Sequence, residues 1–207
     1  CGGSSNDLSS KTWRRKNSIF CKHDISFVTC SKWLANEAKE SALLAEQHVT
    51  NIANPIDTNI FKPADKKEAR TRCGMPQDKR IILFVSQKVT HSNKGMEEIT
   101  GRIPFETIPI GYVNDTKQII DIYNAADVFV LPSLSENLPN TIMESMACGV
   151  PCVGFRIGGI PEEIDHRKNG YVAEYRNAND LANGIHWILN EADYKSLSNE
   201  AITKVAR

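Results

Sequence analysis

Two glutamates, Glu136 and Glu144, lie eight positions apart in the segment PSLSENLPNTIMESMACGVPCV. The first precedes a predicted helix and the second lies inside it, so each could accept hydrogen bonds from a different set of neutral hydroxyl groups. Pro139 suits the first position of this helix and Gly149 suits its end. The ordinary alternative for this spacing is a solvated loop charge followed by a surface helix residue.

The start of the same helix predicts an anion site between the two carboxylates. The amide groups of residues 140–142 would lack partners within a helix that begins at Pro139, and the helix dipole favours negative charge at that end. A phosphate would suit this position. Glu136 would repel the phosphate, so we expect Glu136 to contact neutral hydroxyls. Hydroxyls on both sides of an anion describe a nucleotide sugar, with its ribose, diphosphate and sugar.

Predicted strands and helices alternate along the chain, and the strands are continuously apolar. Both properties are typical of an α/β protein whose parallel sheet is covered on both faces. The apolar run Ile25–Thr29 is interpreted as one such buried strand, and Asn179 is expected to cap a late helix. Ligands of these sheets bind beyond the carboxyl ends of the strands, where the segment with the two glutamates lies. The strands are expected at residues 25–29, 48–52, 80–86, 107–113, 127–133, 151–155 and 169–174.

The composition excludes several classes of function. The 207 residues carry a formal net charge of zero, which gives no global argument for a nucleic-acid partner. The apolar runs are far shorter than the roughly 20 residues of a membrane helix, and we see no signal peptide. The six cysteines form no CxxC pair, so a reduced, cytoplasmic protein is expected. No metal site is expected either, because neither an acidic pair nor zinc spacing is present.

The run YNAADVFVLPSLSENLPNTIMESMACGVPCVGFRIGGIPEEI resembles the donor-binding half of family 4 glycosyltransferases, which have the GT-B fold of two Rossmann-like domains facing a cleft. The resemblance covers most of the chain after residue 55. It implies a Rossmann-like parallel-sheet domain of GT-B type with part of a second Rossmann-like domain. The residues that match the family's pattern are Asp127, Pro132, Ser133, Glu136, Glu144, Gly149, Pro151, Gly158, Gly159 and Glu162.

The resemblance also implies roles for individual residues. Glu136 would contact the donor sugar, and Glu144 would bind the ribose hydroxyls. Gly158 and Gly159 would let the backbone come close to the ligand. The backbone that holds the sugar and diphosphate would be that of Asn137, Leu138, Pro139, Asn140 and Thr141. The nucleobase would lie against a turn formed by Gly111, Tyr112 and Val113.

A basic segment of the family, G-R-x5-K-G, corresponds to SQKVTHSNKG in this chain. Lys88 stands at the arginine position, Lys94 stands at the lysine, and Gln87 replaces the glycine. Lysine can neutralise a leaving diphosphate but lacks the bidentate fork of arginine. The resemblance therefore makes Lys88 and Lys94 catalytic residues alongside Glu136, and the alternative is two solvated loop lysines.

The resemblance divides the chain into three parts. Residues 1–55 would be the end of the N-terminal acceptor domain plus a linker, residues 56–190 the donor-binding domain, and residues 191–207 a C-terminal helix. The family normally has the rest of a helix, a strand and a further helix between NKGMEEIT and GRIPFETIPIGYV, which are contiguous here. We therefore expect the sequence to consist of pieces of a longer protein.

The implied function is transfer of a sugar, with retention, from a nucleoside-diphosphate sugar to a glycan or lipid-linked acceptor, in cell-surface polysaccharide synthesis and without a cofactor. A nucleotide-sugar 2-epimerase of the same fold and a non-catalytic nucleotide-sugar-binding module are the alternatives. The segment KTWRRKNSIFCK could touch an anionic membrane as a helix, or be the solvated end of a domain. The expected location is cytoplasmic, with contact at the inner face of the membrane left open.

Overall fold

The computed structural model describes residues 7–85, 106–110, 113 and 115–206 of the chain. The chain divides into two compact units, residues 1–54 (unit 1) and residues 55–207 (unit 2). The junction between NKGMEEIT and GRIPFETIPIGYV, where the family pattern is interrupted, lies outside the described residues. The assignment of the units to acceptor and donor domains stays a prediction.

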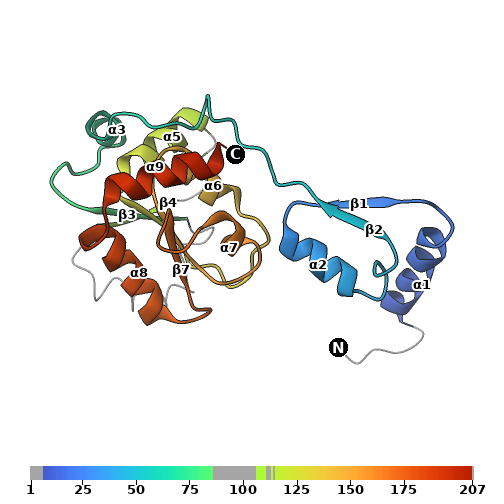
Figure 1. Cartoon of the computed structure of the whole chain (residues 1–207). Coiled ribbons are helices and arrows are strands. Elements are labelled where there is room, and N and C mark those ends of the chain that lie inside the picture. Colours follow the sequence, from blue (N-terminus) through green and yellow to red (C-terminus); the bar gives the residue numbers. More distant parts are fainter. Residues whose placement is uncertain (1–6, 86–105, 111–112, 114, 207) are drawn as a thin grey trace. The chain divides into compact units, whose positions relative to one another are not determined.

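Unit 1 contains a two-stranded parallel sheet with two helices (Figure 1). Ser31 caps the second helix, because its hydroxyl accepts a hydrogen bond from the Leu34 amide at 3.0 Å. The elements of this unit are α1 (Leu8–Phe20), β1 (Ser26–Thr29), α2 (Lys32–Glu40) and β2 (His48–Asn51).

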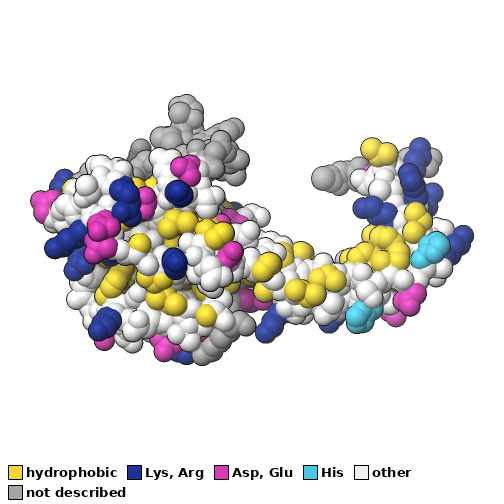
Figure 2. Space-filling view, turned by 90° about the horizontal axis from the view of Figure 1, so that it is seen from above, with side chains coloured by type: hydrophobic (Ala, Val, Ile, Leu, Met, Phe, Trp, Pro, Cys, Tyr) yellow, Lys and Arg dark blue, Asp and Glu magenta, His cyan; other side chains and the backbone are white. Residues whose placement is uncertain are grey.

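The prediction that Ile25–Thr29 is a buried strand is wrong. Side chains of β1 alternate between exposed and half-buried, and Val28 is 59% exposed. Phe27 points to the other face, where its ring meets that of Phe20 at 5.0 Å. The strand is partly covered on one face only, because the described part of unit 1 supplies cover for that face alone. Figure 2 shows the resulting hydrophobic side chains on the surface of unit 1.

Unit 2 is an α/β domain with an all-parallel sheet, as the sequence predicts. The strand order is β4-β3-β5-β6-β7, so the chain goes to one side of β3 and then returns to the other. The reversal places a topological switch point between β3 and β5. The elements are α3 (Lys66–Cys73), β3 (Ile81–Val85), β4 (Glu106–Ile110), α5 (Thr116–Ala125), β5 (Val128–Leu131), α6 (Asn140–Ala147), β6 (Cys152–Phe155), α7 (Ile160–Glu163), β7 (Gly170–Ala173), α8 (Ala178–Asn190) and α9 (Tyr194–Val205).

The sheet of unit 2 is buried on both faces, as its continuously apolar strands predict. All residues of β5, β6 and β7 are buried. Alternate residues of β5 belong to two different hydrophobic clusters, Phe129 to one with Ile142 of α6, and Val130 to the other with Ile185 of α8. The strands therefore form a rigid support for the loops that leave their ends.

Two predicted helix starts are displaced. Pro139 is the N-cap of α6 rather than its first residue. Asn177, not Asn179, caps α8, since its side chain accepts a hydrogen bond from the Asp180 amide at 3.1 Å. Two asparagines are present within three positions, and only the fold decides which one takes the extended backbone of an N-cap.

The predicted end of α6 is confirmed. Gly149 has a left-handed backbone with φ of 78°, and its amide donates to the Met146 carbonyl at 2.9 Å. The Val150 amide donates to the Ser145 carbonyl at 3.0 Å, which completes a Schellman motif. In the part of the chain that the structure describes, no helix has the length and apolarity to cross a bilayer.

Candidate functional site

The loop from Pro132 to Pro139 leaves the carboxyl end of β5, next to the switch point between β3 and β5. This is the position at which parallel α/β sheets bind ligands. Glu136 lies in the loop and is half-buried, and Glu144 lies on α6, which follows directly. The predicted placement of the two glutamates, one before a helix and one within it, is confirmed.

A glycine turn before α7 packs directly against this loop. Gly158 has φ of 56°, and a Cβ atom there would lie 2.0 Å from the Glu136 carbonyl oxygen. The amide of Gly159 donates to the Asn137 carbonyl at 2.5 Å. Both glycines therefore have a structural role in holding the loop, whereas their predicted approach to a ligand stays a prediction.

A tyrosine holds the same loop from another direction. The hydroxyl of Tyr175, just after β7, donates to the Leu134 carbonyl at 3.0 Å. Its ring makes an edge-on contact with Phe155 at the end of β6, with the centroids 6.5 Å apart. The loop that carries Glu136 is thus attached to the segments that follow both β6 and β7.

Glu144 is half-buried and hydrogen-bonded, unlike a solvated surface residue. Its Oε2 accepts a hydrogen bond of 2.8 Å from the hydroxyl of Tyr123, which is fully buried on α5. Burial raises the pKa of Glu144, and the hydrogen bond from Tyr123 acts in the opposite direction because it favours the ionised carboxylate.

The first turn of α6 offers fewer amides than predicted. The Ile142 amide donates to the Pro139 carbonyl at 3.0 Å, so the prediction that it is free for an anion is wrong. A tightened first turn of this kind is a common way to satisfy a helix end. Thr141 of the same turn is half-buried, and Asn140 is exposed.

Glu163, on α7, is a further acid close to Glu136. It is 3% exposed, and neither of its carboxyl oxygens has a hydrogen-bond partner among the described residues. Burial raises the pKa of Glu163 to about 9, and the nearby carboxylates of Glu136 and Glu162 contribute to the increase. Burial therefore favours the neutral form of Glu163, which lies close to an acidic residue of the loop.

Several predicted site residues cannot be placed. Lys88, Lys94, Gly111 and Tyr112 lie outside the described residues. Val113 is half-buried and packs against the core cluster that contains Phe129. Within residues 7–85, 106–110, 113 and 115–206, no group of His, Cys, Asp and Glu side chains could hold a metal ion.

Three residues of this region were missed by the sequence interpretation: Tyr123, Glu163 and Tyr175. A signal existed for Tyr123, because it follows the isoleucines of the segment DTKQIIDIYNAA and a buried tyrosine hydroxyl requires a partner. For Glu163 and Tyr175 the sequence holds no such signal, since their positions depend on how α7 and the segment after β7 pack.

Residues 103–204 match the family model described as glycosyl transferases group 1. Among curated proteins, the chain is 21% identical over 196 residues to N-acetyl-alpha-D-glucosaminyl L-malate synthase of Bacillus anthracis, which covers 81% of this chain and 51% of that protein. The chain spans about half the length of the curated relatives it matches.

Solved structures share the fold. Sucrose-phosphate synthase from Thermosynechococcus elongatus matches with a TM-score of 0.80 and 18% identity, over 100% of this chain and 59% of its own. Anabaena HepE in complex with UDP matches with a TM-score of 0.77 and 17% identity, over 98% of this chain and 65% of its own. Residues 103–204 therefore resemble the glycosyltransferase group 1 family, and the chain shares its fold with these solved structures.

Proposed function

We propose that the protein is a retaining glycosyltransferase that uses a nucleoside-diphosphate sugar as donor and a glycan or lipid-linked molecule as acceptor. One observation carries the proposal: Glu136 and Glu144 follow the carboxyl end of β5, beside the switch point of the parallel sheet, in a stretch that matches the glycosyltransferase group 1 family model. A loop held by Gly158, Gly159 and Tyr175 gives Glu136 the fixed position that a sugar-binding residue requires.

In this proposal, Glu144 binds the ribose and Glu136 binds the transferred sugar. Between them, the backbone of residues 137–141 holds the sugar and diphosphate. Bond cleavage at the sugar gives oxocarbenium character and increases the negative charge on the diphosphate, which Lys88 and Lys94 would neutralise. The proposed transfer involves no step that requires a metal or a cofactor.

The identity of the donor is supported by one structural neighbour. Solved structures of Anabaena HepE contain UDP and UDP-glucose, and both match this fold. We therefore propose UDP-glucose as the first donor to test, followed by GDP- and ADP-sugars. A ligand that binds the folded state raises the melting temperature, and the increase grows with the ratio of ligand concentration to dissociation constant. A thermal-shift series at one ligand concentration can therefore rank the nucleotide sugars by affinity.

A cytoplasmic location at the membrane surface, in cell-surface polysaccharide synthesis, is proposed on the properties of α1. All of its described residues are exposed or half-buried, and Leu8 and Trp13 are 80% and 43% exposed. The basic residues of the segment are Lys11, Arg14, Arg15, Lys16 and Lys22. Binding to vesicles with anionic lipid, lost when Lys11, Arg14 and Arg15 are replaced by glutamine, would support this contact.

Two substitutions test the assignment of the glutamates. Because free UDP lacks the sugar, Glu136→Gln should bind UDP almost normally while Glu144→Gln should not. In a longer protein that transfers sugar from UDP-glucose to an acceptor, Glu144→Gln should raise KM, whereas Glu136→Gln should lower kcat by something like the 10²-fold that misplacement can cost. Equal effects of the two substitutions on UDP binding would contradict the assignment.

The 207-residue chain itself should bind donor and transfer nothing, because it spans about half the length of its curated relatives. Labelled donor separates the alternatives: transfer to an acceptor by a longer protein, an epimerised sugar, and binding without turnover are different products. Robust transfer by the purified 207-residue chain would show that no further acceptor domain is needed.

A further inference from the structure

Tyr123 connects the interior of unit 2 to the candidate site. Its ring is fully buried and meets Phe129 of β5 edge-on, with the centroids 5.8 Å apart and the planes at 80°. Its hydroxyl reaches Glu144 on the neighbouring helix at 2.8 Å. One end of the side chain is therefore held by the core, and the other holds a carboxylate that the proposed function assigns to the ribose.

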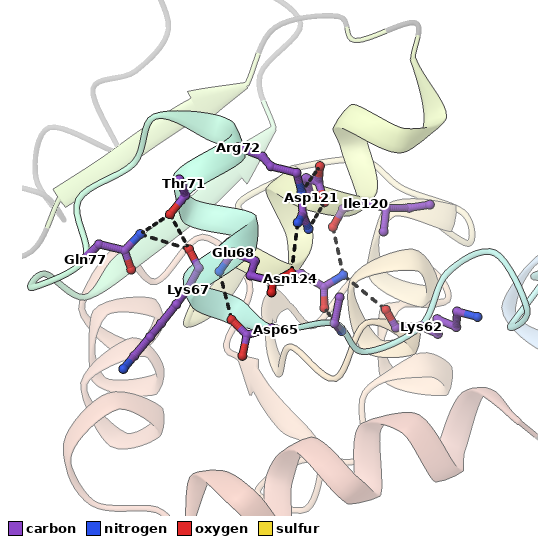
Figure 3. A network of polar contacts seen from close by, with 11 residues as sticks. Lys62, Asp65, Lys67, Glu68, Thr71, Arg72, Gln77, Ile120, Asp121 and Asn124 are labelled. Carbon is purple, nitrogen blue, oxygen red and sulfur yellow. Dashed lines mark hydrogen bonds and ion pairs between the residues drawn. The ribbon is translucent and has the colours of Figure 1, made fainter.

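The helix that carries Tyr123 is fixed at the adjacent residue. Asn124 accepts a hydrogen bond from the Ala64 amide at 2.7 Å and donates to the carbonyls of Lys62 and Ile120. Figure 3 shows the Asn124 side chain reaching from α5 to the segment that precedes α3. The Tyr123 hydroxyl is consequently presented from a rigid position.

The same helix is tied to α3 by an ion pair. Arg72 donates from two nitrogens to the two carboxylate oxygens of Asp121, at 2.9 and 2.7 Å, and these bonds are drawn in Figure 3. Paired bonds of this kind fix orientation as well as distance. α5 therefore has polar anchors on both sides of Tyr123, at Asp121 and Asn124.

The bond to Tyr123 fixes the direction of the Glu144 carboxyl group and favours its ionised form. Oε2 is occupied by the tyrosine, and no described residue has a recorded hydrogen bond to Oε1. Burial raises the pKa of Glu144, while the tyrosine opposes this increase. A carboxyl group with one oxygen fixed is prepared to accept hydrogen bonds from hydroxyl groups at the other.

We propose that Tyr123 is a positioning residue for the nucleotide: its hydroxyl fixes Oε2 of Glu144 so that Oε1 accepts the ribose hydroxyls of the donor. The inference rests on the proposed function but adds Tyr123, a residue that the sequence interpretation did not assign to the site. A purely structural tyrosine would affect all ligands of the domain alike, whereas a positioning residue affects only those that carry ribose hydroxyls.

The test compares UDP with 2′,3′-dideoxy-UDP by calorimetry on the 207-residue chain. Tyr123→Phe keeps the ring and removes the hydroxyl, and should weaken UDP by about tenfold, as expected for the loss of a hydrogen bond to a charged group. Binding of dideoxy-UDP should not change. Partial unfolding would weaken both ligands by the same factor, so the ratio of their affinities remains informative even if the variant is less stable.

Two further variants complete the experiment. Tyr171→Phe is the matched control, because the Tyr171 hydroxyl also donates to a carboxylate. The acceptor is Asp180, at 2.8 Å, and the bond runs from β7 to α8. This variant should leave the ratio of the UDP and dideoxy-UDP affinities unchanged. If Tyr123 acts through Glu144, the double variant of Tyr123→Phe with Glu144→Gln should bind UDP no more weakly than Glu144→Gln alone.

The outcomes separate the inference from the function on which it rests. An unchanged ratio in Tyr123→Phe, with normal UDP binding by the wild type, would overturn the role of Tyr123 and leave the proposed function standing. If the losses of UDP affinity from Tyr123→Phe and Glu144→Gln add up in the double variant, the role of Tyr123 is likewise overturned and the proposed function stands. If the wild type binds none of UDP, GDP and ADP, the nucleotide site itself falls and the inference falls with it.

Discussion

Asp127 and Glu163 are both acids of unit 2 and both are 3% exposed, yet their surroundings differ completely. Asp127 accepts hydrogen bonds from Arg70 at 2.7 Å, from Lys66 at 2.9 Å and from the Ile81 amide at 2.7 Å. Glu163 has no recorded hydrogen-bond partner in the described part of the chain. Equal burial therefore accompanies an ion-pair cluster at Asp127 and an acid with a raised pKa at Glu163.

The two acids also lie in different parts of the sheet. Asp127 immediately precedes β5, at the amino end of the strand, and connects it to α3 and to the start of β3. Glu163 lies close to Glu136, whose loop follows the carboxyl end of β5, and this is the position at which parallel α/β sheets bind ligands. The contrast teaches that a buried carboxylate stabilises a fold only where other segments bring donors to it.

The largest effect is expected from Asp127→Asn. This substitution leaves the guanidinium of Arg70, which is itself buried, without its counter-charge. Removing one partner of a buried pair typically costs about 3–5 kcal/mol of the free energy of unfolding. Urea unfolding of the 207-residue chain at pH 7 would measure it. If Asp127→Asn lowers the free energy of unfolding by less than about 1 kcal/mol, the donors around Asp127 do not stabilise the fold more than the surroundings of Glu163 do.

Glu163→Gln should remove a pH dependence of the free energy of unfolding, and it breaks no hydrogen bond among the described residues. The folded state keeps the proton on Glu163 up to about pH 9, whereas an unfolded glutamate loses it near its ordinary pKa of 4.5. Between these values the folded state binds more protons, so stability falls as pH rises, by up to about 1.4 kcal/mol per pH unit. The contribution is fully present below pH 4.5 and is lost as pH approaches 9.

The measurement compares the wild type with Glu163→Gln in urea at pH 6 and pH 8. The wild type should lose more stability than the variant between the two conditions, because the amide does not titrate. Parallel losses would mean that Glu163 is paired or solvated in solution.

The smallest effect is expected from Glu174→Gln. Glu174 pairs with Arg156 at 3.3 Å, and the two side chains are 65% and 53% exposed. Exposed pairs contribute about 0–1 kcal/mol, so the variant should unfold close to the wild type. If Glu174→Gln lowered the free energy of unfolding as much as Asp127→Asn, charge pairing rather than burial would account for the effect at Asp127.

Local patterns in the sequence predicted the arrangement of the site well. The apolar runs at β3, β5 and β6 required burial on both faces, and Gly149 marked the end of α6, since only local backbone geometry is involved. The order of loop and helix then placed Glu136 and Glu144 at one end of the sheet. Helix starts were less certain, because Pro139 and Asn140, or Asn177 and Asn179, satisfy similar local rules.

What the sequence by itself determined is the class of the domain, the succession of its elements and the two acids that follow β5. The tertiary structure alone decided which apolar strand stays exposed, as Val28 shows, and which acid finds donors. Asp127 meets donors up to 61 positions away, and Tyr123 meets Glu144 across 21 positions. Burial and long-range hydrogen bonds depend on which segments pack together, and the identity of a residue does not contain that information.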